Sequence, residues 1–260
     1  QMFGNHLARV PAFSQEFKND EKTSALFRNA VFATSADEIV LTEGGGKITL
    51  TLTSPILNGL QLIKFFEVTP DSYIVNYRVQ LINRSNETQT LEVLYFFGEQ
   101  RLSDSSGGMQ QVAHEGPVFY FDESLQTETT DNIEGELPVT QMKWLGVEDQ
   151  YFISAALPMT PIRNGLFRAG AYLSDPQANV QGERLLSPYF GVALPSTNLQ
   201  PNLLVESEFN LYYGPKEDEE LLKFGHNLVV SHDMTLEVLA GPLLDLLRLI
   251  YGYAGNYGVA

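Results

Sequence analysis

The four histidines, His6, His114, His226 and His232, have the widest chemical range of the residues in this sequence. Histidine can transfer protons near neutral pH or bind a metal ion through a ring nitrogen. A metal-binding pair on one helix face needs i, i+4 spacing, whereas His226 and His232 are six positions apart. His232 and Asp233 could form an acid–base pair, but adjacent residues of a strand or loop usually point apart. We therefore interpret the histidines as structural or solvent-exposed and predict no metal site.

Glu206 and Glu208 form the most suggestive pair of carboxylates, because alternation places them on one face of an extended strand. Two carboxylates that flank a glycosidic bond can act as acid and as nucleophile or base. The sequence around this pair is not unusually apolar, and 32 acidic residues make such pairs frequent. A solvated sheet face is the favoured interpretation.

The remaining chemical motifs also have structural interpretations. Gly44–Gly46 lacks the Gly-Lys-Ser/Thr ending of a phosphate loop and lies between two expected strands, so it predicts a β-hairpin turn. Trp144, the only tryptophan, could stack on a sugar or a peptide but is more often a core residue. No Gly-x-Ser-x-Gly nucleophile motif is present. We predict no catalytic residue and no cofactor, and hence that the chain is not an enzyme.

Composition narrows the possible partners. The 260 residues carry 32 acidic and 16 basic side chains, a formal charge of −16, and clustered Lys and Arg for nucleic-acid phosphates are absent. The same charge argues against broad attraction to anionic lipid. The chain has no cysteine, which excludes disulfides without distinguishing a reducing from an oxidising compartment. It shows neither a signal-peptide pattern nor a run of 18 apolar residues, so we expect no membrane-spanning segment within it.

Strand patterns dominate the chain from Glu38 to Gly214. Residues 72–83 alternate most clearly, because Tyr73, Val75, Tyr77, Val79 and Leu81 point one way and Asn76, Arg78 and Gln80 the other. The other expected strands are 38–43, 47–54, 59–68, 90–100, 117–124, two within 142–158, 166–174, 185–195 and 203–214. Asn58-Gly59 is a favoured hairpin dipeptide. This succession of strands and turns predicts a mostly β fold, an antiparallel sandwich or barrel.

The two ends of the chain differ from this pattern. Residues 1–36 predict an irregular segment with one short strand and a polar loop at 16–22. A short helix is expected at about 215–225. Pro215 would be its first residue, and acidic residues would occupy its first turn, where the helix dipole favours negative charge. Residues 126–138 are acidic and polar and are expected to be exposed.

The last stretch, residues 233–260, predicts an amphipathic helix. Its apolar face comprises Leu236, Leu239, Leu243, Leu247 and Ile250. Pro242 would break the helix, so we expect residues 235–240 to pack on the sandwich and residues 242–253 to form an amphipathic connector at a membrane interface. Glu237, Asp245 and Arg248 sum to −1, so attraction to anionic lipid is not expected to be its anchor.

Three motifs in this order resemble the periplasmic domain of the YidC-type membrane protein insertase. The first is Trp144-Leu145-Gly146-Val147 followed by Tyr151-Phe152 and Pro158, which looks like a strand pair of that family. The second, Leu211-Tyr212-Tyr213-Gly214-Pro215-Lys216, is similar to its Leu-Tyr-x-Gly-Pro-Lys element. The third, Gly255-Asn256-Tyr257-Gly258, is similar to the entry into the first helix of the insertase core. The likeness runs from about Tyr73 to the end and is loose before that.

The resemblance implies an antiparallel β-supersandwich, galactose mutarotase-like, with short C-terminal α-helices. It implies a domain over 1–232 and the connector over 233–260, at the periplasmic face of a Gram-negative inner membrane. Expected partners are accessory subunits of the Sec translocon, nascent membrane proteins and, through the connector, the membrane interface. We expect the isolated domain to be monomeric. The insertase core lies outside these residues, so no insertase-active residue can be transferred to this chain.

Three functions remain open at this point. The leading one is a non-catalytic module that docks partners and positions the core of an insertase. The second is a sugar-binding or mutarotase-like domain, which would need a histidine such as His114 and a carboxylate together in a cleft. The third is a secreted adhesin-like sandwich, which would not explain the apolar stretch 233–260.

Overall fold

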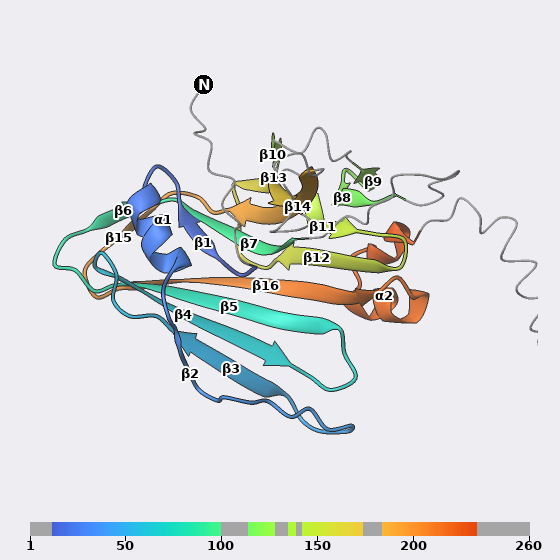
Figure 1. Ribbon diagram of the computed structural model, residues 1–260, viewed down its shortest axis with the longest axis horizontal. Helices are drawn as coiled ribbons and strands as arrows, with labels where there is room; N and C mark the ends of the chain where they lie inside the picture. Colours follow the sequence, from blue (N-terminus) through green and yellow to red (C-terminus); the bar gives the residue numbers. More distant parts are fainter. Residues whose placement is uncertain (1–11, 100–113, 128–134, 139–141, 174–183, 233–260) are drawn as a thin grey trace, which may run out of the picture.

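The computed structural model describes residues 12–99, 114–127, 135–138, 142–173 and 184–232. His6 and the expectations for residues 233–260, including the apolar helix face and the Gly-Asn-Tyr-Gly motif, lie outside the described residues. The described part is mostly β, and its strands pair antiparallel in two large sheets and one small one (Figure 1).

The larger sheet has nine strands. In spatial order they are β2 (Ala33–Thr34), β3 (Ile48–Thr53), β4 (Leu60–Val68), β5 (Ile74–Asn83), β16 (Leu204–Pro215), β12 (Phe152–Pro158), β11 (Met142–Glu148), β8 (Gly116–Phe121) and β9 (Ser124–Thr127). The second sheet contains β1 (Gln15–Phe17), β7 (Val93–Glu99), β14 (Arg184–Ala193), β13 (Asn164–Leu173) and β10 (Gly135–Pro138). The pair β6 (Gln89–Leu91) and β15 (Thr197–Leu199) stands apart.

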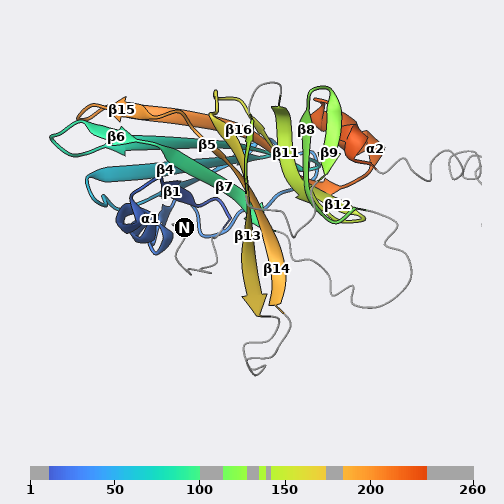
Figure 2. The same cartoon turned by 90° about the horizontal axis from the view of Figure 1, so that it is seen from above.

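The two large sheets pack face to face, and β13 and β14 cross the strands of the larger sheet at a steep angle (Figure 2). The core between them is rich in aromatic rings, with Phe209 of β16 lying 4.8 Å from Phe97 and 5.2 Å from Tyr95 of β7 between ring centroids. Such pairs contribute beyond the area that they bury. The prediction of an antiparallel β-sandwich is confirmed.

Alternation determines which face of each strand enters this core. In β5, Tyr77, Val79 and Leu81 are fully buried, as their spacing predicts. The turn before β4 also has the expected form, because Asn58 and Gly59 both adopt positive φ, at 48° and 76°, as a tight hairpin requires. The polar residues of β5 lie on the outer face of the larger sheet.

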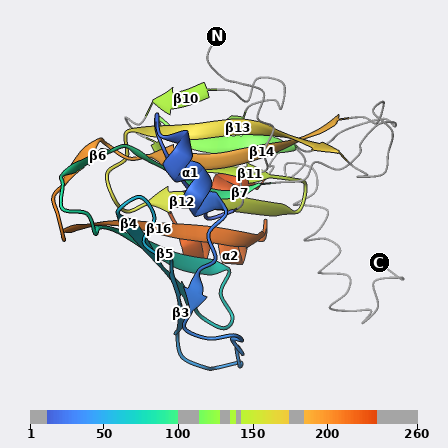
Figure 3. The same ribbon diagram turned by 60° about the vertical axis from the view of Figure 1, so that its left-hand side comes forward.

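The N-terminal part contains a helix that the sequence interpretation missed. Helix α1 (Glu21–Arg28) begins within the segment predicted to be a polar loop, and Asp20 caps it by accepting a hydrogen bond from the Thr23 N–H at 3.0 Å. Strand β1 joins the edge of the smaller sheet at β7, and β2 joins the edge of the larger sheet at β3. Figure 3 shows α1 lying across one side of the sandwich, between the two layers.

The prediction of a strand at 38–43 is wrong. Val40 and Leu41 are 64% and 47% exposed, so neither face of this segment packs on a core. Gly44–Gly46 therefore does not join two strands of a hairpin. Gly45 N–H donates to the Thr42 carbonyl at 2.8 Å, which makes a turn within an irregular loop.

Several short elements differ from the sequence interpretation. The expected strand 90–100 divides into β6 and β7, which belong to different sheets, and β15 was not predicted. Strands β9 and β10 include the two ends of the stretch 126–138, which was expected to be exposed and in which no strand was predicted.

Two short helices follow β16, α2 (Asp218–Phe224) and η2 (Leu228–Ser231). Pro215 ends β16 instead of opening the helix, so the start predicted at about 215 is three residues early. Leu221 and Phe224 are buried on the outer face of the larger sheet, where they form a second core with Trp144, Tyr120 and Tyr212. The packing of Leu221 and Phe224 in this second core determines the position of α2 on the sheet.

Gly146 of β11 shows how closely the strands approach. A Cβ at Gly146 would lie 2.1 Å from the carbonyl oxygen of Ser154 in β12, and backbone atoms there cannot move without disturbing the strand pair. We expect Gly146→Ala to lower the free energy of unfolding by about 1–3 kcal/mol in urea titrations. Gly46→Ala is the control, because nothing lies within 4 Å of the position that its methyl group would take. Equal stability of the two variants would contradict this account.

Candidate functional site

Most of the family-like residues of the described part meet at one end of the sandwich, with Pro158 at the other end of β12 as the exception. Trp144 is fully buried, its ring stacks on Tyr120 at 6.1 Å between centroids, and its Nε1 donates to the His226 carbonyl at 3.2 Å. Trp144 therefore ties β11 to the loop between α2 and η2. It is a core residue, as its sequence context favours, and does not line an open cleft.

The end of β16 is held by Tyr212 and Gly214. The Tyr212 hydroxyl donates to the Pro215 carbonyl at 2.7 Å, and its ring lies 5.8 Å from that of Phe224 in α2. Burial raises the pKa of Tyr212, with Glu220 adding to the effect, so the hydroxyl stays protonated and can donate. A Cβ at Gly214 would lie 2.6 Å from Cγ of Tyr73, so glycine permits this close approach.

Lys216 connects this end to the turn between β11 and β12. Its Nζ lies 3.2 Å from Oε2 of Glu148 and donates to the Asp149 carbonyl at 3.3 Å. The two paired side chains are only 4% and 2% exposed. The Lys216 backbone N–H also donates to the Tyr151 carbonyl at 2.8 Å. A buried ion pair therefore joins two family-like motifs that are distant in the sequence.

Two residues of the first motif, Tyr151 and Phe152, lie at the surface. Tyr151 and Phe152 are 65% and 56% exposed, and Pro158 is half-buried at the far end of β12. Tyr73 and Leu222 are also exposed, and all four large side chains belong to segments at the α2 end of the sandwich (Figure 1). We call Tyr73, Tyr151, Phe152 and Leu222 the junction patch.

The junction patch lies where the described chain ends. Ser231 is the last residue of η2, and the next residue, His232, places its Nδ1 2.7 Å from Oδ1 of Asp218 in α2. Residues 233–260 therefore continue from a point beside α2, which we call the exit point. The residues that hold α2 and η2 in place also fix this point.

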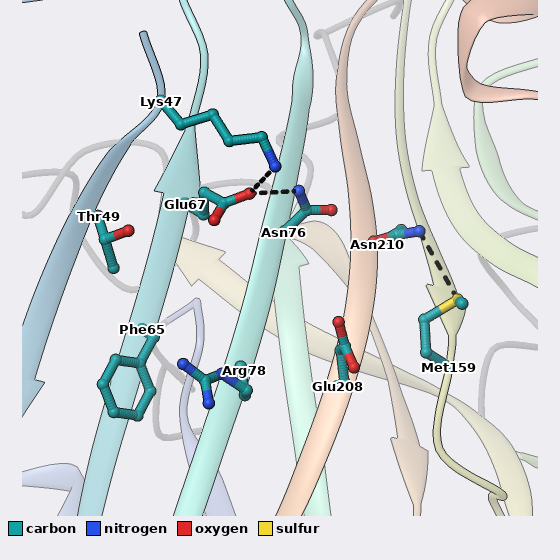
Figure 4. Close-up of a pocket in the computed structure, with 9 residues that line it drawn as sticks. All are labelled: Lys47, Thr49, Phe65, Glu67, Asn76, Arg78, Met159, Glu208 and Asn210. Carbon is teal, nitrogen blue, oxygen red and sulfur yellow. Dashed lines mark hydrogen bonds and ion pairs between the residues drawn. The ribbon is translucent and has the colours of Figure 1, made fainter.

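A separate groove crosses the outer face of the larger sheet. Its volume is about 370 Å³, and polar side chains from β4, β5 and β16 line it (Figure 4). Lys47 Nζ contacts Oε1 of Glu67 at 2.6 Å, and Asn76 Nδ2 donates to the same oxygen at 3.1 Å. These bonds, that from Lys47 above all, lower the pKa of Glu67 and keep it ionised.

Arg78 occupies the next position of the groove. Its Nη1 contacts Oε2 of Glu206 at 3.1 Å, and its guanidinium carbon lies 4.4 Å from the centre of the Phe65 ring. Glu208 is exposed and lines the groove, so the interpretation of Glu206 and Glu208 as a solvated sheet face agrees with the structure. The groove itself was missed, because it depends on the register of four strands. The alternating polar residues of 76–80 were its only sequence signal.

The three histidines of the described ranges do not line this groove. His114 Nε2 lies 3.1 Å from the Pro117 carbonyl, the His226 carbonyl accepts from Trp144, and His232 pairs with Asp218. Over the described ranges, no group of three or more His, Cys, Asp or Glu side chains could hold a metal ion. The His–carboxylate pair expected of a mutarotase-like cleft is not found in the described lining of the groove.

Solved structures with a similar arrangement are distant in sequence. A galactose mutarotase related enzyme from Lactobacillus acidophilus aligns with a TM-score of 0.38 and 12% identity over 72% of each chain. A putative aldose 1-epimerase from Escherichia coli aligns with a TM-score of 0.41 and 13% identity over 72% of this chain and 68% of that one. These values carry no information about a shared activity.

Within the described residues, no helix combines the length and the apolar character needed to cross a membrane.

Curated relatives are closer. A membrane protein insertase YidC from Psychromonas ingrahamii is 29% identical over 234 residues, which cover 88% of this chain and 39% of the relative. The YidC insertase of Aromatoleum aromaticum is also 29% identical, over 88% of this chain and 41% of the relative. The chain thus spans about two fifths of the length of these relatives. The family model described as YidC periplasmic domain matches residues 9–246, and the chain belongs to that family.

Proposed function

We propose that this chain is a non-catalytic periplasmic module of a membrane protein insertase, at the periplasmic face of a Gram-negative inner membrane. It would aid the insertion and folding of inner-membrane proteins by docking partners and by holding the core in position. The expected partners are accessory subunits of the Sec translocon and nascent membrane proteins. Residues 233–260 would connect the sandwich to the membrane interface.

One observation carries this proposal. Trp144, Tyr212, Gly214 and Lys216 come from two separate motifs and share one structural task. Trp144 and Tyr212 contact α2 and the loop before η2, and Gly214 and Lys216 hold the end of β16 from which α2 follows. Their contacts are structural, because three of these side chains are buried and hydrogen-bonded to backbone groups. What they determine is the position of the exit point, from which residues 233–260 continue. A rigid exit point suits a module that holds a membrane-embedded core.

The junction patch supports docking at the same end. Four large apolar or aromatic side chains are exposed there, each by 45% or more. Aromatic side chains are favoured at protein interfaces because they bury a large area at a low entropic cost. We propose that this patch contacts the insertase core or a translocon subunit beside it.

Site-specific photo-crosslinking in the full-length protein tests the docking proposal. A photoreactive residue would replace Tyr151 or Leu222 in the patch, and Ile56 as the control, because Ile56 is 58% exposed and precedes β4 at the opposite end of the sandwich. We expect adducts with the insertase core or a translocon subunit, identified by mass, from the patch positions and much less from Ile56. Equal adduct yields at the three positions would refute docking at this end.

A further inference from the structure

We propose that the groove on the outer face of the larger sheet binds an extended peptide in which a basic side chain adjoins a run of apolar residues. This inference rests on the proposed function, since it names the class of client segment that such a module would hold. It concerns a surface separate from the junction patch. The hydrogen-bond acceptors of the groove and the apolar hollow beside it favour a peptide of this kind.

Most charges of the groove are already neutralised. Lys47 pairs with Glu67, and Arg78 pairs with Glu206 while its guanidinium lies over Phe65. The carboxylate of Glu208 is different, because no side chain in the described part of the protein pairs with it. One negative charge is therefore left over in the groove lining, at Glu208.

Two amide oxygens add to this acceptor group. Asn76 and Asn210 are direct cross-strand partners on β5 and β16. The Asn76 amide nitrogen donates to Glu67 and that of Asn210 points to the sulfur of Met159 at 3.6 Å, so both oxygens turn toward the gap between the strands (Figure 4). A carboxylate and two amide oxygens favour a ligand that is cationic and carries several N–H donors. A lysine ammonium or an arginine guanidinium meets this description.

The surroundings of Glu208 are apolar on one side. The Glu208 carbonyl accepts from the Met159 N–H at 2.9 Å, and its N–H donates to the Thr160 hydroxyl at 2.8 Å. These bonds hold the segment after β12 against β16. A second hollow of about 310 Å³ begins there, lined by Met142, Pro158, Met159, Pro161 and Ile162 together with Thr160. Met159 lines both hollows and is 54% exposed.

The polar and apolar hollows therefore share Met159, and Glu208 lines the polar one beside it. Methionine is flexible and polarisable, so a Met-lined hollow accommodates apolar side chains of different shapes. A saccharide fits less well, because the aromatic ring in the groove, Phe65, already carries the Arg78 guanidinium on one face. Lys and Arg side chains occur beside the apolar runs of membrane segments. The proposed occupant is a segment of this kind.

Fluorescence anisotropy with the full 260-residue chain tests the inference. The probe is a labelled, end-blocked peptide, Gly-Lys-Leu-Ile-Leu-Val-Gly, and the matched peptide carries Glu in place of Lys. We expect the Lys peptide to bind more tightly. Glu208→Gln should weaken the Lys peptide by about 10-fold, because it removes the charged acceptor. Met159→Ser should weaken both peptides, because it removes part of the apolar hollow.

Glu87→Gln is the matched control, because Glu87 is exposed, undergoes the same change of charge and lies outside the groove lining. We expect it to leave both dissociation constants unchanged. Equal affinity for the two peptides, or equal weakening by Glu208→Gln and Glu87→Gln, would overturn the inference. So would galactose binding that depends on Glu208 in the absence of peptide binding. The assay reports on the groove alone, so its failure is distinguishable from failure of the crosslinks at the junction patch.

Discussion

Replacing Lys216 by Met should lower the free energy of unfolding by about 3–5 kcal/mol, and Glu148→Gln should also destabilise the protein strongly. The two side chains are 3.2 Å apart and almost completely buried, so either change leaves the other charged group without its partner in a site that water does not reach. The Asp149 carbonyl would lose the donor from Lys216 as well. Urea unfolding followed by the fluorescence of Trp144, the single and buried tryptophan, measures the change.

Two further variants test whether the loss of stability comes from an unpaired buried charge or from lost packing. The double variant Lys216→Met with Glu148→Leu removes both charges, and we expect it to be more stable than either single variant. Arg78→Gln is the surface control, because the Arg78 and Glu206 side chains are 42% and 38% exposed. Its effect should stay below about 1 kcal/mol. If Arg78→Gln and Lys216→Met destabilised the protein equally, the buried pair would have no special role in holding the exit of the chain.

Local patterns in the sequence predicted the larger part of the fold. The alternation in 72–83 identifies the buried face of β5, because a half-buried strand must place Tyr77, Val79 and Leu81 on one side. Helix α1 was missed because it has eight residues and its signal is an Asp20 cap inside a polar run. For residues 38–43 a strand was predicted that does not form. Residues that favour strands produce one only where a partner strand and a core are available.

The sites were less predictable, because they depend on strand order. Lys216 meets Glu148 only because β12 pairs with β16 and β11 pairs with β12. In the same way, the groove exists because the register places Asn210 opposite Asn76 and Glu208 opposite Arg78. Local patterns do not contain this information. The resemblance names the residues at the junction, but their contacts with one another follow from the strand pairing.

Lys64 predicts a dependence of stability on pH. This lysine points into the sandwich from β4, where its Nζ donates to the Phe13 carbonyl at 2.7 Å and lies 4.5 Å from the centre of the Phe32 ring. Among the described residues, no carboxylate pairs with it. Burial lowers the pKa of Lys64 from 10.5 to about 8. Between these values the unfolded chain binds a proton that the folded protein does not, so the free energy of unfolding rises with pH.

From pH 7.5 to pH 9.5 this one group should raise the free energy of unfolding by about 2 kcal/mol. The rise in the free energy of unfolding should end near pH 10. Burial raises the pKa of Tyr77 and that of Tyr95, so the folded state retains protons that unfolded tyrosines lose. Stability should therefore fall again above that pH. Urea titrations across the range measure the whole curve.

Comparison with Lys64→Met isolates the contribution of Lys64, since all other groups titrate equally in both proteins. The Phe13 carbonyl keeps a donor in this variant, because Gln15 Nε2 also donates to it at 3.0 Å. We expect the rise between pH 7.5 and pH 9.5 to be smaller by about 2 kcal/mol in Lys64→Met. Lys143→Met, which removes a lysine that is 40% exposed, should keep the rise of the parent protein. An unchanged rise in Lys64→Met would show that the buried amine keeps its proton throughout, and that the aromatic ring and the carbonyl stabilise the charged form.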